Sequence, residues 1–420
     1  MTKLAIVTIG SRGDVQPYVA LGAGLQRAGF QVRLATHGRF AAFIEQHGLQ
    51  FFPLPDDPKE MLNTPTGRDW VGSGQNPVRF FRAFNRLTGD RLPALLTATE
   101  KACAGVDGVL FALFGVPAYH VAEKMGIPAI MAALQPVSRT AAFQAMGAPE
   151  IFWANGWSNY ISHLVVEQIF WQPFRRQYNQ WRQKQLGLPN ASFWGPYREI
   201  ERRKNPVLYG FSRHVLPRPD DWNDNIQISG YWFLNGSADW QPDPGLADFL
   251  AAGPPPIAVG FGSMVTPDPV RFTQMVVQAV EQAGQRAVFL TGWGGLQPDN
   301  LPDFIYPLEA APHDWLYERV TAVVHHSGAG TTAASLRAGR PTIAVPFFAD
   351  QYFWAARIKA LGVGPIPIPR DKLTTANLAQ AIITAVTDPT IQANAAQLGE
   401  KIRAEDGVGR AVAAVQAIFG

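Results

Sequence analysis

Short apolar runs, several of them rich in β-branched residues, alternate with helical segments through both halves of this chain. In the first half the expected strands and glycine-terminated helices are Leu4–Ile9, Gln16–Ala28, Gln31–Thr36, Phe40–His47, Gln50–Pro53, Gly108–Ala112, Ala118–Met125, Ala129–Ala133 and Val207–Gly210. In the second half they are Ile257–Phe261, Pro269–Ala283, Arg286–Leu290, Ala322–His325, Thr331–Ala338, Thr342–Val345, Thr375–Val386 and Pro389–Phe419. This alternation is typical of parallel, doubly wound sheets, so we expect an α/β protein.

Prolines and polar residues cluster between Pro217 and Pro256, which is typical of a linker. We therefore expect one Rossmann-like domain over residues 1–230, a linker over 231–256 and a second such domain over 257–420. The two would face each other across a cleft, and the last helix would pack back on the first domain. The aromatic stretch Ala142–Lys204 is expected to form helices inserted beside the first sheet.

Composition excludes several classes of protein. Charged residues make up 16% of the 420 residues and the net charge is +3, which argues against a dedicated nucleic-acid binder. Cys103 is the only cysteine, so no intramolecular disulfide forms, and a reducing cytosol is the simple inference. The apolar run at the N-terminus is short for a signal peptide, and no run approaches the roughly 20 apolar residues of a membrane span. We expect a cytoplasmic protein, at most peripheral to a membrane.

The loop Gly10–Pro17 follows the first expected strand and leads into the first helix. Parallel sheets bind ligands beyond the carboxyl ends of their strands, so this loop is a candidate site. Its glycines do not make the G-x-G-x-x-G pattern of dinucleotide binding. Asp14 suits an N-cap for a helix that starts near Val15. A carboxylate in this position could also accept a proton from a substrate hydroxyl, and the two roles compete only partly.

The richest stretch runs from His313 to Gln351. Its centre, Val323–Thr332, is a strand followed by Ser-Gly-Ala-Gly-Thr-Thr and a helix. Backbone N–H groups at such a helix start converge on an anion and suit a diphosphate, to which His326 could add a hydrogen bond or a positive charge. Each piece also has an ordinary structural explanation. The turn could be tight packing, Trp315 could be core, and Asp350-Gln351 could cap the next helix. Paired histidines with no third ligand at suitable spacing make a metal site a poor interpretation.

Taken together, these segments resemble the inverting family-1 glycosyltransferases of the GT-B fold. Within that family the chain looks most like sterol and lipid glucosyltransferases and bacterial enzymes that glycosylate glycopeptide and macrolide antibiotics. The resemblance is carried by five motifs, which are Gly10–Tyr18, Pro312–Leu316, His325–Thr332, Ser335–Gly339 and Pro346–Gln351.

The resemblance implies a role for each candidate residue. Asp14 would be the base that deprotonates the acceptor. The donor would be a nucleotide sugar, in the first instance UDP-glucose. It would be bound at Ser11, Arg12, Gly13, Ser263, His313, Trp315, His326, Gly328, Ala329, Gly330, Thr331, Asp350 and Gln351. Within this set, Ser263, His326 and Gly328–Thr331 would hold the diphosphate. His313–Trp315 would meet the base, and Asp350-Gln351 would meet the sugar hydroxyls.

The chain also departs from the family pattern. Many relatives have a histidine at position 14, paired with an aspartate about a hundred residues on, whereas Leu110–Phe114 contains no carboxylate. Eukaryotic relatives often carry a ribose-binding Glu where this chain has Thr332–Ser335, so UDP over dTDP is an inference. No Asp-x-Asp motif occurs, which supports transfer without a metal or other cofactor.

Five tryptophans lie between Trp153 and Trp194, among other aromatic and many basic residues. They suit either an ordinary helix-packing core or a large apolar acceptor. The basic residues suit a solvated helix face, the more common case, or an anionic membrane surface. The leading hypothesis is a transferase that acts on a hydroxyl of a sterol, another lipid or a polyketide. An antibiotic-type enzyme using a UDP- or dTDP-sugar is the alternative. A sugar-nucleotide epimerase and a non-catalytic nucleotide-sugar binder are disfavoured.

Overall fold

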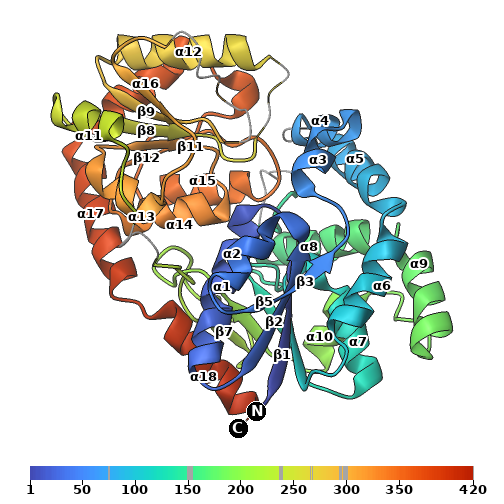
Figure 1. Cartoon of the computed structure of the whole chain (residues 1–420). Helices are drawn as coiled ribbons and strands as arrows, with labels where there is room; N and C mark the ends of the chain where they lie inside the picture. Colours follow the sequence, from blue (N-terminus) through green and yellow to red (C-terminus); the bar gives the residue numbers. More distant parts are fainter. Residues whose placement is uncertain are drawn as a thin grey trace. The chain divides into compact units, whose positions relative to one another are not determined.

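A computed structural model of the chain describes residues 1–73, 76–148, 155–235, 240–264, 266, 268–292, 296 and 301–419 (Figure 1). The chain divides into two compact units. Unit 1 comprises Met1–Trp70, Asn76–Leu234 and Glu405–Gly420, and unit 2 comprises Asn235–Ala404 with the short segment Val71–Gln75. Each contains one parallel sheet with helices, so the expected α/β class is confirmed.

Unit 1 contains a seven-stranded sheet in the order β3-β2-β1-β4-β5-β6-β7, with every neighbouring pair parallel. Its strands are β1 (Lys3–Val7), β2 (Gln31–His37), β3 (Gln50–Leu54), β4 (Gly108–Phe111), β5 (Ala129–Ala133), β6 (Val207–Tyr209) and β7 (Ile226–Ile228). Its helices are α1 (Arg12–Arg27), α2 (Ala41–Glu45), α3 (Pro58–Asn63), α4 (Pro65–Val71), α5 (Pro77–Gly89), α6 (Leu92–Ala102), α7 (Pro117–Met125), α8 (Gly156–Trp171), α9 (Arg175–Trp181), α10 (Pro196–Arg202) and α18 (Gly407–Phe419).

Unit 2 contains a five-stranded parallel sheet in the order β10-β9-β8-β11-β12. Its strands are β8 (Ile257–Gly260), β9 (Ala287–Leu290), β10 (Ile305–Leu308), β11 (Val323–His325) and β12 (Thr342–Ala344). Its helices are α11 (Pro244–Ala251), α12 (Pro269–Gln282), α13 (His313–Leu316), α14 (Ala329–Arg337), α15 (Gln351–Ala360), α16 (Thr375–Thr387) and α17 (Pro389–Arg403).

Both sheets reverse their strand order once. In unit 1 the chain builds outward from β1 to β3 and then returns to the other side of β1 with β4. In unit 2 the same reversal lies between β8 and β11. At such a point the loops after two neighbouring strands diverge, which leaves a crevice at the carboxyl edge of the sheet. The loops that follow β1, β4, β8 and β11 are therefore the places to look for ligand-binding residues.

Several elements differ from the sequence-based expectation. Helix α1 begins at Arg12, four residues before the expected start. Two edge strands, β7 and β10, were not anticipated because one lies in the proline-rich stretch and the other contains Pro307. Proline is compatible with an edge strand because the edge needs no ladder hydrogen bond on its outer side. The expected linker 231–256 contains α11, and residues 236–239 lie outside the described part of the chain.

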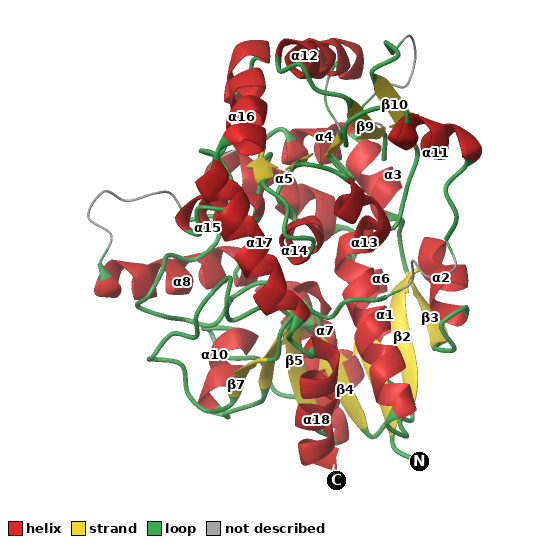
Figure 2. Cartoon of the chain, turned by 90° about the vertical axis from the view of Figure 1, so that its left-hand side faces the viewer, coloured by secondary structure: helices red, strands yellow, loops and turns green. Residues whose placement is uncertain are grey.

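Helix α18, the last of the chain, packs within unit 1 (Figure 2). Its buried residues Ala411, Val412 and Val415 belong to the same core cluster as Leu21 and Leu25 of α1. The approach is close, because a Cβ on Gly24 of α1 would lie 2.5 Å from a methyl group of Val408.

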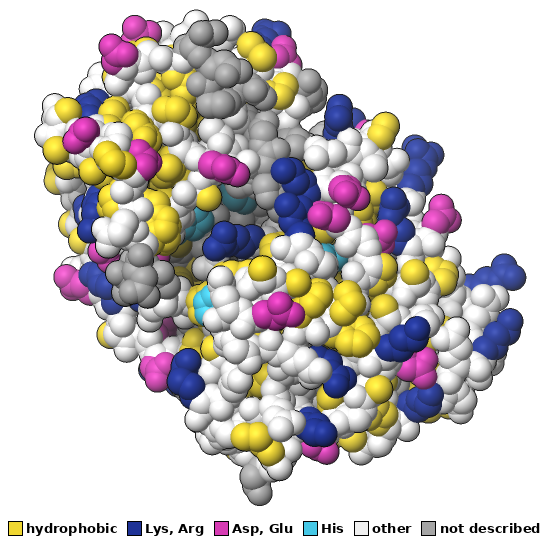
Figure 3. All heavy atoms as spheres, viewed as in Figure 1, with side chains coloured by type: hydrophobic (Ala, Val, Ile, Leu, Met, Phe, Trp, Pro, Cys, Tyr) yellow, Lys and Arg dark blue, Asp and Glu magenta, His cyan; other side chains and the backbone are white. Residues whose placement is uncertain are grey.

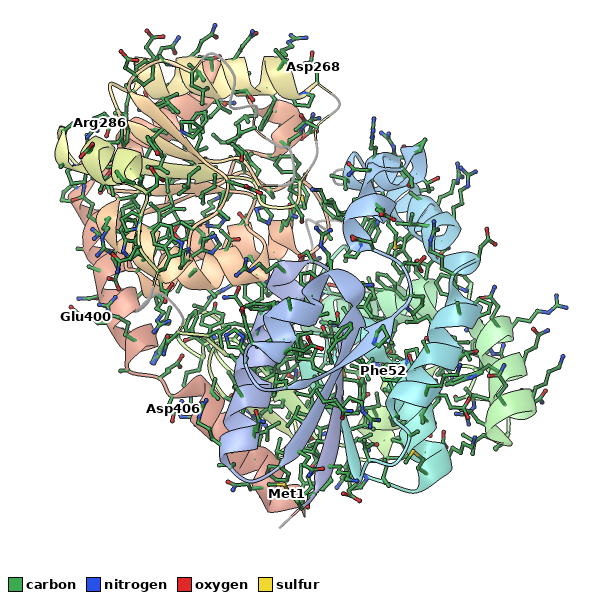
Figure 4. All side chains as sticks on the ribbon, in the orientation of Figure 1. Met1, Phe52, Asp268, Arg286, Glu400 and Asp406 are labelled. Carbon is green, nitrogen blue, oxygen red and sulfur yellow. The ribbon has the colours of Figure 1, made fainter. Side chains whose placement is uncertain are left out.

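Charged side chains of both signs are interspersed over the face shown in Figure 3. At the start of α18, Asp406 (labelled in Figure 4) accepts a hydrogen bond from the N–H of Gly409 at 2.8 Å and so caps the helix. In the described part of the chain, no helix combines the length and apolarity that crossing a membrane requires.

Candidate active site

Asp14 lies in the first turn of α1, directly beyond the carboxyl end of β1. Its Oδ2 accepts hydrogen bonds from the N–H of Ser11 at 2.8 Å and from the Ser11 hydroxyl at 3.0 Å. Ser11 is the N-cap residue, so Asp14 occupies the third helical position of a capping-box arrangement and is not the N-cap that we expected. Burial raises the pKa of this carboxyl, and the Ser11 hydrogen bonds oppose that shift. Asp14 is thus a stronger base than an ordinary aspartate.

The loop before Asp14 is fixed from the other side by His37, which sequence reasoning missed. The N–H of Gly10 donates to Nε2 of His37 at 3.3 Å, and His37 Nδ1 lies 2.9 Å from the carbonyl oxygen of Asp56. Because a carbonyl can only accept, Nδ1 carries the proton and Nε2 is the acceptor. Burial also lowers the pKa of His37, which favours this neutral form. Gly10 has φ +144°, and a Cβ there would lie 2.4 Å from Asp14 Oδ2. A glycine directly before a polar loop is the only signal in the sequence.

The loop after β4, at the same point of strand reversal, carries aromatic residues and no carboxylate. Gly115 lies against the end of β1, since a Cβ on it would lie 2.4 Å from the carbonyl oxygen of Val7. Beside it, Phe114 is 40% exposed. Its ring is 5.8 Å from Phe84 of α5 and 6.4 Å from Phe170 of α8. The aromatic cluster, which we define as Phe80, Phe81, Phe84, Phe114 and Phe170, therefore adjoins the strand that leads to Asp14.

In unit 2, two glycines lie against His326 at the strand reversal, and a third packs behind one of them. A Cβ on Gly328 would lie 2.5 Å from Nε2 of His326, and one on Gly262 would lie 2.9 Å from its Cε1. Gly262 and Gly292 both have φ +58°, and a Cβ on Gly292 would meet the carbonyl oxygen of Gly262 at 2.5 Å. Each glycine stands two or three residues after the end of a strand, a spacing that could have been recognised in the sequence. They let the loops after β8 and β11 approach one imidazole, with the loop after β9 packed against the loop after β8.

His326 is a neutral group in this setting. Its side chain is buried, and its Nδ1 has no hydrogen-bond partner within the described ranges. Burial, followed by the charge of His313, lowers its pKa to about 4. The sequence left open whether His326 would offer a diphosphate a hydrogen bond or a positive charge. Because the imidazole is neutral in the free protein, the hydrogen bond is favoured.

Helix α14 begins beside this imidazole with an open end. Its N-cap is Gly328, which has no side chain to accept from the first turn, and that turn contains no acidic residue. The backbone enters the helix through Ser327 at φ +64°, held by a hydrogen bond from the Ser327 N–H to His325 Nδ1 at 2.9 Å. Since Thr332 is the first residue whose N–H reaches Gly328 O, the N–H groups of residues 329–331 have no helical acceptor. This end of α14 can accept an anion.

The loop after β12 carries Asp350 and Gln351. The Gln351 side chain is buried and turned into its own loop, where Oε1 accepts from the N–H of Phe347 at 2.8 Å and Nε2 lies 3.2 Å from Sδ of Met264. This side chain braces the loop. Asp350 is the N-cap residue of α15 without a side-chain cap hydrogen bond. Contact of this pair with a sugar stays a prediction.

The residues assigned to the nucleotide base lie on α13. His313 stacks on Tyr317 with 4.7 Å between ring centroids, and Trp315 meets Trp240 edge-on at the same distance. The Arg319 guanidinium lies 4.2 Å from the centroid of the Trp315 ring. Trp315 is half-buried, so both interpretations, core packing and base contact, remain open. Ser263 follows β8 in the turn Phe261–Met264 and is also half-buried.

Three further residues of the first loop were assigned to the donor. Ser11 uses its hydroxyl on Asp14, as described above. Arg12 is exposed, bonds Gln16 Oε1 at 3.0 Å and lies over the ring of Phe43, while Gly13 is exposed in the first turn of α1. Their donor role stays a prediction. Within the described ranges, no group of His, Cys, Asp and Glu side chains has the arrangement of a metal site.

Two family models match the chain. Residues 4–144 match the glycosyltransferase family 28 N-terminal domain, and residues 294–415 match the erythromycin biosynthesis protein CIII-like C-terminal domain. Sterol 3-beta-glucosyltransferases of Emericella nidulans and Glomerella lagenarium are each 38% identical to this chain over 98% of its length. The matched regions make up 30% and 28% of those proteins, so the chain spans less than a third of their length.

Solved structures of two glycosyltransferases have the same fold. The glycosyltransferase of kitacinnamycin superposes with a TM-score of 0.74 at 19% identity and covers 100% of this chain and 99% of its own. CalG4, the calicheamicin glycosyltransferase, gives 0.71 at 18% identity, with coverage of 100% and 98%. These likenesses concern the fold alone. The chain therefore has the GT-B fold of these glycosyltransferases, and its two halves are similar to the family 28 N-terminal domain and to the CIII-like C-terminal domain.

Proposed function

We propose that this protein transfers a hexose, in the first instance glucose from UDP-glucose, to a hydroxyl group of a hydrophobic acceptor such as a sterol or other lipid. The observation that carries the proposal is the pairing of Asp14 with the aromatic cluster at one strand reversal of unit 1. A base and an apolar surface at the same sheet edge suit a hydroxyl on an apolar molecule. The 38% sequence identity with a sterol 3-beta-glucosyltransferase supports the choice of acceptor.

In the proposed reaction Asp14 takes the proton of the acceptor hydroxyl. The acceptor oxygen then forms a bond to the anomeric carbon as the bond from that carbon to the diphosphate breaks, which inverts the configuration. The nucleoside diphosphate leaves with increased negative charge on its oxygens. The open N-terminus of α14 and the His326 imidazole would stabilise that charge, since hydrogen-bond donors aimed at developing charge lower the barrier most.

An alternative acceptor is a polyketide or other antibiotic-like natural product, with a UDP- or dTDP-sugar as donor. The overall fold favours it, because VinC, a glycosyltransferase solved in complex with dTDP, has a TM-score of 0.66 to this chain at 15% identity. An epimerase or a non-catalytic sugar-nucleotide binder is less well supported. An epimerase needs ionisable groups around the sugar, and the loop of Asp350 offers one carboxylate and an amide already engaged with its own backbone.

A matrix of donors and acceptors tests the proposal. UDP-glucose, UDP-galactose and dTDP-glucose would be combined with a sterol, a flavonoid and a macrolide, and products identified by mass. We expect the sterol with UDP-glucose to give the most product. Preference for the macrolide with dTDP-glucose would establish the alternative. Epimerised sugar nucleotide without any acceptor product would overturn the transferase assignment.

We further propose that transfer needs no metal ion, because hydrogen-bond donors replace a cation at the diphosphate. Initial rates should be the same in EDTA and in magnesium. A strict requirement for a divalent ion would contradict this.

Action in the cytoplasm and peripheral contact with a membrane belong to the same proposal, since sterol-like acceptors are held in membranes. Cys103 is consistent with a reducing compartment, as it is buried and burial raises its thiol pKa to about 12.

A further inference from the structure

An exposed pair of aromatic side chains lies in the loop before α10. The rings of Phe193 and Trp194 are 53% and 42% exposed, and they meet edge-on with centroids 5.5 Å apart. We call this pair the aromatic tip. Burying such rings ordinarily contributes a few kcal/mol to stability, so leaving both in water calls for an explanation.

The backbone of the aromatic tip is firmly held. Gln172 of α8 donates to the carbonyl oxygen of Phe193, and Gln168 donates to that of Trp194, each at 2.9 Å. Gly195 follows with φ +86°, and a Cβ on it would lie 2.8 Å from the Trp171 ring. The rings are therefore presented to the outside from an ordered support, and their exposure does not come from a loose loop.

Helix α8, which supports the tip, has its polarity reversed. Its inward residues include Asn159, Ser162 and His163, which bond the backbone of Ala141, Ala145 and Phe143 respectively. Its outward residues include Trp157, 75% exposed, and Val165, 50% exposed. A helix that bonds the protein through polar side chains and exposes apolar ones presents a face suited to contact with a partner.

The outward apolar residues and the tip supports share one face of α8. At about 100° per residue, positions 157, 165, 168 and 172 fall within about 80° of one another. Trp157 and Gln168 are separated by roughly 16 Å along the helix at a rise of 1.5 Å per residue. Trp157, Val165 and the aromatic tip therefore lie on the same face of α8, which is seen in Figure 2.

The segment that carries the tip is positively charged. Residues 168–204 contain eight Lys and Arg residues and two Glu residues, which gives a net charge of +6, whereas the whole chain carries +3. The remainder of the chain is thus net negative. Of the eight, Arg182 is buried and paired with Glu123. Arg175 and Arg198 lie over the rings of Phe193 and Trp194 at 5.0 and 4.9 Å. Lys and Arg side chains project where α9 lies in Figure 3.

We propose that Trp157, Val165 and the aromatic tip contact the surface of an anionic lipid bilayer, with the arginines around them facing the lipid headgroups. Exposed aromatic rings beside basic residues suit the interfacial layer of a membrane. Charge complementarity selects this occupant over a second copy of the chain, because two surfaces of the same positive sign repel each other.

The inference rests on the proposed lipid acceptor, because such an acceptor is held in a bilayer. Phe170, which belongs to the aromatic cluster, lies in α8 between the two glutamines that hold the tip. At about 100° per residue it lies on the opposite side of α8 from those glutamines, so this helix carries both the proposed membrane contact and part of the aromatic cluster on different faces.

The test is co-sedimentation of the full chain with vesicles. Phosphatidylcholine alone would be compared with phosphatidylcholine plus phosphatidylglycerol, at low and raised salt. We expect binding to the anionic vesicles that salt weakens, and a loss of about tenfold or more in the double variant Phe193→Ser, Trp194→Ser. The double variant Arg175→Gln, Arg198→Gln should weaken binding to the vesicles that contain phosphatidylglycerol and leave binding to pure phosphatidylcholine vesicles unchanged.

A matched control removes two apolar side chains that are equally exposed in unit 2. Val270 and Ile366 are 57% and 71% exposed, and their change to Ser should leave vesicle binding unchanged. The proposal would be overturned if the control variant lost as much vesicle binding as the tip variant, or if the tip variant bound vesicles as well as the original protein. It would also be overturned if the original protein bound no vesicles. Thermal melts of each variant separate loss of binding from loss of folding.

Enzyme assays keep this inference distinct from the proposed function. Transfer to a water-soluble hydroxyl acceptor should be unchanged in the tip variant, whereas transfer to a sterol in anionic vesicles should fall. Absence of transfer to every acceptor would refute the function while the vesicle result still stands. Normal transfer to the vesicle-borne sterol by the tip variant would refute the membrane contact alone.

Discussion

Helices α1 and α14 both begin at the strand reversal of their sheets, although α1 follows β1 and α14 follows β11, the strand on the other side of the reversal in unit 2. Their first turns differ in charge. The start of α1 is occupied by its own Asp14 carboxylate, which is hydrogen-bonded to Ser11. The start of α14 has neither a capping side chain nor an acidic residue. A helix start at a strand reversal thus carries the candidate base in one unit and the candidate anion site in the other.

Removal of the base should have the largest effect. Asp14→Asn keeps an oxygen to accept from Ser11 and removes the proton acceptor, so kcat should fall by about 10²- to 10⁴-fold while donor affinity is nearly retained. The matched control is Asp388→Asn, which alters the N-cap of α17 with a comparable hydrogen-bond pattern. Turnover like that of the original protein in Asp14→Asn would refute the base assignment.

A second change makes α14 resemble α1. Thr331 occupies the third position of α14, as Asp14 does in α1, so Thr331→Asp places a carboxylate at the open end. Repulsion should weaken binding of UDP by about a hundredfold, although the helix itself gains roughly 0.3–1 kcal/mol from its dipole. Calorimetric titration measures the affinity. Thr331→Asn is the uncharged control, and equal affinities in the two variants would contradict an anion site here.

Loss of the imidazole beside α14 should have a smaller effect. His326→Ala removes a hydrogen bond to a charged group, worth about 1.5–3 kcal/mol, so UDP affinity should fall by about ten- to a hundredfold. Because burial lowers the pKa of His326 to about 4, the difference between variant and original protein should persist at neutral pH and above. His47→Ala, which changes a histidine in the turn between α2 and β3 of unit 1, is the control. Unchanged affinity would exclude His326 from the site.

The smallest change concerns the support of Asp14. The Ser11 hydroxyl stabilises the ionised carboxylate, so Ser11→Ala should raise the Asp14 pKa further. Activity needs ionised Asp14, is present above its pKa, and is lost as pH falls through it. The acid limb of kcat should therefore lie above the ordinary pKa of an aspartate, about 3.9, and move to still higher pH in Ser11→Ala. If the acid limb of kcat stays at the same pH in Ser11→Ala, a group other than Asp14 controls it.

Sequence patterns were most informative where local chemistry decides the structure. Strand β5 lies exactly where its apolar run predicted, at Ala129–Ala133, and both parallel sheets follow from the alternation of strands and helices. The start of α1 was misplaced because the capping box depends on a carboxylate three residues beyond Ser11 that folds back onto it. Helices α3–α6 lie in a stretch without clear alternation. Trp153, one of the five tryptophans of the expected insert, lies outside the described residues.

The candidate site likewise contains parts that the sequence predicts and parts that only the structure shows. The sequence by itself located Asp14 as the candidate base, the glycine-rich turn and the alternating strands and helices of the two α/β units, because each depends mainly on residues close together in the chain. Only the tertiary structure revealed that His37, at the end of β2, accepts a hydrogen bond from Gly10, and that Gly262 lies against His326. Those contacts join residues distant in sequence, and long-range packing decides them. For the same reason the reversed polarity of α8 became visible only when its burial was known, since its composition is that of an ordinary core helix.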